Sequence, residues 1–233
     1  MGRAKIKKKS TFIDMTAMSD VTVLLLTFFM LTSTFLQKEP VTVLTPSSVS
    51  EIKVPMTNTT TVLISPEGKV FLSVAGDADS TYSSEKVRAE LVRIAVAEYN
   101  KTHSKQVQLT NEQVAKFSKM NMFGIRIADL PAFLDLPQIK QDEVLTDMNN
   151  PSTGIPVDDN KDLAKPNEFQ IWMRAIYNSS NPNLESSIKS GEGIAIKADK
   201  DTPYTTVHDV LDNLQTLKMN KFSLMTALKT END

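Results

Sequence analysis

A carboxylate and three hydroxyls are aligned within an apolar stretch near the start of the chain. Residues 15 to 36 contain a single charged side chain, Asp20. At 100° per residue in a helix, Thr16, Thr27 and Thr34 fall within about 40° of Asp20, and Leu24 lies on the same side. A carboxylate flanked by hydroxyls that can bond water is able to bind and release a proton. This stripe is the strongest candidate for chemistry in the sequence.

A simpler interpretation needs no chemistry at all. Threonines in an apolar helix often bond back to their own backbone, and an aspartate near the interface can extend toward water. Thr22 and Thr32 lie off the stripe, so the alignment is imperfect. However, an ionised carboxylate in mid-span costs about 2.5 to 3.5 kcal/mol. A lone anchor would be more stable without it, which favours a proton-binding Asp20 that faces the helices of a partner.

The length and flanks of the stretch predict one membrane crossing. Its 22 residues would cover roughly 33 Å as a helix, close to the thickness of the hydrocarbon layer. Five cations precede the first acidic residue, Asp14, which favours a cytoplasmic amino end and an exported remainder. A cleaved signal peptide is the main alternative. The polar residues in the stretch and the lack of an Ala-x-Ala site before Gln37 argue against it.

Composition excludes several classes of function. The 233-residue chain has a net charge of −2 and no cysteine, so a nucleic-acid partner, disulfides and zinc-thiolate sites are not expected. His103 and His208 lie far apart and lack companions at ligand spacing. No phosphate-binding loop or nucleophile motif occurs, and we expect neither enzymatic activity nor a metal or organic cofactor.

The remainder predicts a small α+β domain. Residues 38 to 60, with three prolines, are expected to form an extended tether, followed by a hairpin over residues 60 to 74. A helix capped by Ser83 or Ser84 should follow. Helical spacing of apolar residues also predicts a helix from about Tyr204, and the sheet should be built from both ends of the chain, with helices on one face.

The middle of the chain, residues 101–190, is expected to be a largely helical insertion. Helices are predicted near 111 to 121, 129 to 135 and 167 to 178, with an exposed loop over residues 147 to 167. Aromatic and apolar residues in the last helix could form a recognition surface, but their spacing of three and four residues is more typical of a core. They are Phe169, Trp172, Ile176 and Tyr177.

Two stretches resemble the ExbD/TolR family of energy-transducing motor subunits. The stronger match is "DVTVLLLTFFM", in which Asp20 falls on the proton-carrying aspartate of the family and Thr16 on a threonine common four residues earlier. The sequence departs from the family at Ala17, often proline, and at Ser19, usually aliphatic. The weaker match is "IAIKADKDTPYTTVHDVLDNLQTLKMNKFSLMT", which is similar to the closing strand, helix and strand of the family.

The resemblance implies an organisation in five parts. These are a cytoplasmic tail (1–11), a transmembrane helix (12–37), a periplasmic linker (38–60), an ExbD-like α+β domain (61–100 and 191–233) and the insertion (101–190).

The resemblance also implies a function at the bacterial inner membrane. Protons would be the coupling ion, with Asp20 as the translocating group and Thr16, Leu24, Thr27 and Thr34 as supporting residues. Expected partners are an ExbB-like multi-span oligomer, a TonB-like transducer, a second copy of the chain and the lipid bilayer. A TolR-like role in envelope integrity, a flagellar-type stator that grips peptidoglycan, and a membrane-anchored scaffold without proton transport remain as alternatives.

Overall fold

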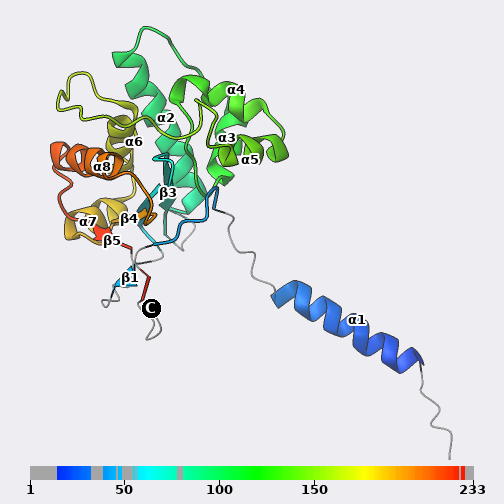
Figure 1. Ribbon diagram of the computed structural model, residues 1–233. Coiled ribbons are helices and arrows are strands. Elements are labelled where there is room, and N and C mark those ends of the chain that lie inside the picture. Colours follow the sequence, from blue (N-terminus) through cyan, green and yellow to red (C-terminus); the bar gives the residue numbers. More distant parts are fainter. Residues whose placement is uncertain are drawn as a thin grey trace, which may run out of the picture. The chain divides into compact units, whose positions relative to one another are not determined.

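The chain forms two compact units, residues 1–38 and residues 39–233 (Figure 1). The computed structural model describes residues 15–32, 39–45, 47–48, 55, 57–77, 81–225 and 227–228. The basic tail and Thr34 lie outside these ranges.

The described part of the first unit is one helix, α1 (Met15–Thr32). Its 18 residues correspond to about 27 Å, and it is long and apolar enough to cross a membrane. None of its residues is buried within the structure. Apolar side chains lie on all sides of it, as is typical of a helix that an apolar solvent surrounds.

The second unit contains a small mixed sheet, which confirms the predicted fold class. Its strands are β2 (Thr59–Ile64), β3 (Val70–Ala75), β4 (Ile194–Ala198) and β5 (Ser223–Leu224), in the order β3-β2-β4-β5. The strands β2 and β3 form the predicted antiparallel hairpin, whereas β2 and β4 pair in parallel, as do β4 and β5. The sheet therefore joins the two ends of the domain, as expected. Separately, β1 (Ser47–Ser48) pairs with β6 (Ala227–Leu228).

Helices cover the sheet and fill the middle of the chain. They are α2 (Ser84–Thr102), α3 (Asn111–Lys119), α4 (Leu130–Asp135), α5 (Gln138–Thr146), α6 (Glu168–Tyr177), α7 (Pro182–Ser190) and α8 (Tyr204–Thr216), with a 3-10 turn at Ile127–Asp129. Capping boxes explain where α3 and α6 begin: Thr110 pairs with Gln113, and Asn167 with Gln170. The helices predicted near 111, 129, 167 and 204 are confirmed, and α5 and α7 were not predicted. Ser83 occupies the N-cap of α2, but its side chain makes no capping bond.

The outer edge of β3 is covered by the middle of the chain. Leu72 and Phe123 exchange two backbone hydrogen bonds of 2.8 Å, and the N–H of Ile155 donates to Val70 at 2.8 Å. Thr153 and Ile155 are almost fully buried. The prediction of an exposed loop over residues 147 to 167 is therefore wrong for 153–155, because these residues protect a strand edge that would otherwise present unpaired backbone groups.

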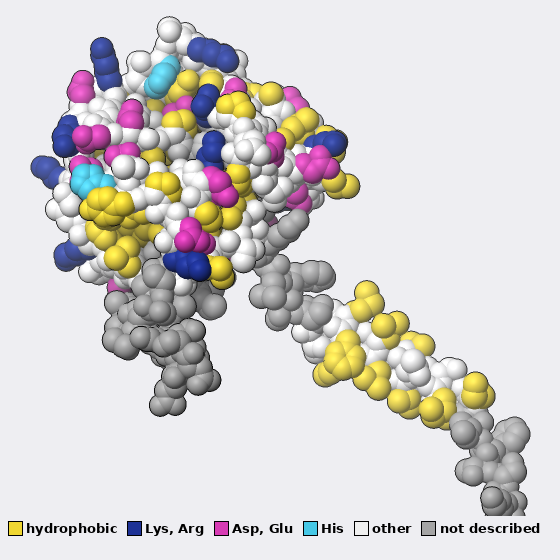
Figure 2. Space-filling model, viewed as in Figure 1, with side chains coloured by type: hydrophobic (Ala, Val, Ile, Leu, Met, Phe, Trp, Pro, Cys, Tyr) yellow, Lys and Arg dark blue, Asp and Glu magenta, His cyan; other side chains and the backbone are white. Residues whose placement is uncertain are grey.

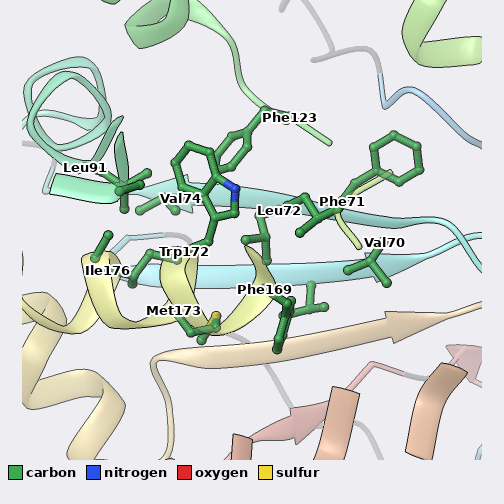
Figure 3. Close-up of a cluster of buried hydrophobic side chains, with 14 of the residues drawn as sticks. Val70, Phe71, Leu72, Val74, Leu91, Phe123, Phe169, Trp172, Met173 and Ile176 are labelled. Atoms are coloured by element: carbon green, nitrogen blue, oxygen red, sulfur yellow. The ribbon is translucent and has the colours of Figure 1, made fainter. Parts of the chain in front are cut away.

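One apolar core runs through the domain. Figure 3 shows Trp172, Phe169 and Ile176 of α6 in one cluster with side chains of β3, α2 and Phe123. The ring of Trp172 stacks on Phe117 at 5.8 Å and lies 4.7 Å from Phe123, between centroids. Phe169, Trp172 and Ile176 therefore belong to the core, which confirms the interpretation that their spacing favoured over a recognition surface.

The start of the linker is not a free tether. Residues 39–45 are extended, as predicted, but they pack on the domain: Val43 is buried, and Val41 is partly buried against the core. The Leu44 N–H donates to Asp199 Oδ2 at 2.7 Å, and the Lys200 N–H donates to the Leu44 carbonyl at 3.0 Å. The prolines that suggested a tether are compatible with an extended segment lying along a domain surface.

Candidate functional site

Helix α1 places the predicted site residues on one face. Thr16, Asp20, Leu24 and Thr27 all lie within Met15–Thr32, and in a regular helix their spacings of four, four and three residues align them along its axis. The helix that the structure shows therefore aligns the four described residues of the stripe on one face. Their roles remain predictions.

The charge of Asp20 has no counter-ion on its own helix. From Met15 to Thr32 the sequence contains no Lys, Arg or His, and Asp20 is the one acidic residue of this stretch. Large apolar side chains cover much of the rest of α1, and Leu24, Phe28 and Phe29 are each about 60% exposed on the isolated helix. Figure 2 shows apolar side chains along much of α1. In a bilayer, any group that compensates an ionised Asp20 must therefore come from another helix or from water.

The hydroxyls of α1 bond back to the helix backbone. Thr27 Oγ1 lies 2.9 Å from the Leu24 carbonyl and 3.0 Å from that of Val23, and Thr22 Oγ1 donates to Met18 at 2.6 Å. Thr27 lies on the stripe and Thr22 lies off it, so this bonding does not distinguish the two. It leaves the hydroxyl oxygens able to accept a hydrogen bond from water or a partner.

The domain presents a different kind of ionisable group. Glu168, in the first turn of α6, accepts a 2.7 Å hydrogen bond from the Ile127 N–H. Burial raises the pKa of Glu168, although this hydrogen bond and the electrostatic influence of His103 and Arg126 oppose the rise. Glu168 lies in the region predicted as an insertion, and the sequence analysis did not identify it.

Arg88 of α2 is buried among neutral acceptors. Its Nε donates to the Val74 carbonyl at 3.0 Å, and one terminal nitrogen donates to the carbonyls of Ser118 at 3.1 Å and Met120 at 2.5 Å. Burial lowers the pKa of this guanidinium. Arg88 thus ties α2 to the end of β3 and to the carboxyl end of α3, where helix carbonyls favour a cation.

The described residues contain no group of three or more His, Asp or Glu side chains placed to hold a metal ion. The two ionisable groups of the domain described above, Glu168 and Arg88, are engaged in structural contacts. This leaves Asp20 as the strongest candidate for a working ionisable group.

Comparison with known proteins agrees with the resemblance seen in the sequence. Residues 7–122 match the family model described as biopolymer transport protein ExbD/TolR. The matched range includes α1, the hairpin, α2 and α3, and it continues past residue 101, so the boundaries of the insertion stay a prediction. No curated protein and no solved structure is found to match the chain. Through residues 7–122, about half of its length, the chain belongs to the ExbD/TolR family.

Proposed function

We propose that this protein is the proton-carrying subunit of an inner-membrane motor, with Asp20 as the group that binds the proton. The family consists of single-span inner-membrane proteins that act in biopolymer transport rather than as enzymes. The observation that carries the proposal is the position of Asp20, an acidic side chain on a helix that offers it no counter-ion.

The cost of an ionised Asp20 in the membrane is similar to the energy that the membrane potential supplies. Holding an ionised aspartate in mid-span costs about 2.5 to 3.5 kcal/mol, and the membrane potential supplies about 2.3 kcal/mol per charge per 100 mV. Protonation removes the charge, so it changes which contacts with surrounding helices are favourable. A proton that enters from the periplasm and leaves to the cytoplasm would therefore drive one cycle of movement between helices.

The proposal requires partners, because a single helix cannot enclose a proton path. We place α1 within an oligomer of an ExbB-like multi-span protein, together with a second copy of this chain. The basic residues before Asp14 favour a cytoplasmic amino end and a periplasmic domain. The domain would pass the movement to a TonB-like protein that energises transport across the outer membrane.

The decisive experiment replaces Asp20 in the full-length chain, expressed with its membrane partner. We expect Asp20→Asn to abolish proton flux into proteoliposomes and energised transport in cells, while the amount of protein in the membrane stays normal. Asp20→Glu keeps an ionisable group and should retain part of both activities. Normal transport with Asp20→Asn would contradict the proposal and would indicate a scaffold.

A matched pair tests the supporting face. Thr27→Val and Thr22→Val each remove one hydroxyl that bonds back to the backbone, but only Thr27 shares the face of Asp20. Proton flux should fall measurably, by at most about tenfold, for Thr27→Val, and it should stay unchanged for Thr22→Val. Equal effects of the two substitutions would show that the stripe has no special role.

Cells that carry Asp20→Asn can also show which outer-membrane process the motor drives. Loss of receptor-dependent uptake across the outer membrane in the Asp20→Asn strain would identify a TonB-linked motor. Loss of envelope integrity with normal uptake would identify the Tol-linked alternative.

A further inference from the structure

The segment of residues 39–45 is held on the domain by contacts that are far apart in the sequence. Lys197 Nζ lies 2.7 and 2.9 Å from the two carboxylate oxygens of Glu39. Asp199, which is 7% exposed, accepts the Leu44 N–H. We call residues 39–45 the strap. Both ends of its described length are fastened to the end of β4.

The strap has the alternating pattern of a strand that lies on a surface. Val41 and Val43 face the domain and are partly or fully buried, whereas Thr42 and Leu44 are exposed. Along β2, Val62, Leu63 and Ile64 are all fully buried, so this strand is covered on both faces. Helices α2 and α6 contribute to the cluster on one face (Figure 3). Lys197 pairs in register with Leu63, so its salt bridge places Glu39 on the side of the sheet to which Leu63 points.

The position of the strap sets how many residues separate α1 from the first docked residue of the domain. Residues 33–38 are six residues, about 20 Å when fully extended. If the strap came off the sheet, the free segment would include at least residues 33–45, about 45 Å. A short connection transmits a movement of α1 to the sheet. A long flexible connection can change its own extension instead, so the sheet need not move.

We propose that the strap is a mechanical coupling element and that Lys197, Asp199 and Val43 keep it engaged. With the strap docked, movement of α1 is transmitted directly to β4 and the rest of the sheet. With the strap released, the proton cycle continues but the domain no longer follows it. This inference rests on the proposed function, since it concerns how the movement leaves the membrane helix.

The first test measures docking itself, by hydrogen exchange of the full-length chain with its partner in nanodiscs. Val43→Asp places a charge in the buried position, and we expect the amides of Leu44 and Lys200 to exchange at least tenfold faster. Glu39→Lys removes an ion pair that is partly exposed, so we expect about a threefold increase. Peptides from α6 should change least, because the described backbone hydrogen bonds of the strap run to Asp199 and Lys200 and not to this helix.

Charge exchange provides the matched control. The double variant Glu39→Lys with Lys197→Glu should restore slow exchange, since the pair is re-formed with its charges swapped. The same exchange at Glu185 and Lys189, which form a 2.6 Å pair on α7, should leave the strap unchanged. If the charge-swapped variant did not recover slow hydrogen exchange, or if exchange were unchanged in Val43→Asp, these contacts would not be what holds the strap on the domain.

The second test separates coupling from proton transport. Val43→Asp should retain at least half of the proton flux while energised transport falls by tenfold or more, and Asp20→Asn should lose both. Normal transport with a released strap would overturn the inference, as would equal loss of flux and transport. Retained flux in Asp20→Asn would instead contradict the proposed function, so the two failures can be told apart.

Discussion

Helix α1 and the sheet domain treat charge and apolar surface in opposite ways. The domain buries its large apolar side chains and surrounds a buried charge, Arg88, with carbonyl acceptors from its own chain. Helix α1 exposes apolar side chains on every side and holds Asp20 without a counter-ion on the helix. The comparison shows that the domain surrounds this buried charge with its own chain, whereas the described residues of α1 are all exposed, as is typical of a helix that an apolar solvent surrounds.

The largest effect should follow from opening the core of the domain. Trp172→Ala removes a fully buried indole that contacts Phe117 and Phe123, so we expect a loss of about 4 kcal/mol in the free energy of unfolding. Circular dichroism during denaturation in detergent measures this loss. The milder Trp172→Phe should cost less, and insertion of α1 into membranes should be unchanged in both. A loss below 1 kcal/mol would contradict the assignment of Trp172 to the core.

Removing the charge of Asp20 should be favourable, in contrast, because it makes membrane insertion of α1 easier. Asp20→Leu replaces a costly group by an apolar one, so membrane insertion of the segment should become more favourable by about 2 to 3 kcal/mol. A translocon insertion assay on residues 1–38 measures the change. Ser19→Leu is a control at the neighbouring position and should shift insertion by less. Unchanged insertion in Asp20→Leu would mean that Asp20 sits outside the apolar layer.

Removing the buried charge of the domain should be harmful instead. Arg88→Leu leaves the carbonyls of Val74 and Ser118 without this donor, and we expect a loss of about 2 kcal/mol in the free energy of unfolding. Fluorescence of Trp172, the one tryptophan of the chain, reports the transition. Arg93→Leu, on the exposed side of the same helix, is the matched control and should cost little. If Arg88→Leu stabilised the domain, the charge of Arg88 would be costly like that of Asp20, and the two regions would not differ in this respect.

The smallest effect concerns Glu168 and depends on pH. Because burial raises the pKa of Glu168 in the folded state, the folded protein binds this proton more tightly than the unfolded chain. The wild type should therefore gain stability relative to Glu168→Gln as the pH falls from 7 through the raised pKa, and the gain should level off below the ordinary value of about 4.5. Denaturation series at several pH values measure it, with the exposed Glu143→Gln as a control. A difference that does not vary with pH would contradict the raised pKa.

Local signals in the sequence were enough to predict much of the fold. The "SPEGK" turn between two apolar runs predicted the β2–β3 hairpin, and Gly68 adopts the left-handed φ of +76° that such a turn favours. Apolar spacing predicted α2, α6 and α8. Helix α7 also has clear signals that the sequence analysis missed: Asn181 as N-cap, Pro182 in the first turn and Gly191 at φ +101° after the end. Helix α5 offers weaker signals, since it buries only Gln141 and Leu145.

Contacts between distant parts of the chain could not be predicted in the same way. "EPVTVLT" has the alternation of a strand, but nothing near it indicates that its partners are Lys197 and Asp199. The burial of residues 153–155 against the edge of β3 likewise depends on a partner more than 80 positions away. The candidate site is the reverse case, because helical geometry alone brings Thr16, Asp20 and Thr27 to one face.

The parallel pairing of β2 with β4 has a consequence for the biogenesis of the protein. Thr60 is paired with Ile194, so β2 has only β3 as a partner until most of the polypeptide has been synthesised. Closing so long a loop is slow, and the hairpin alone is at most marginally stable. During synthesis the nascent chain thus lacks its finished sheet, and the sheet closes only after its last segments have been made.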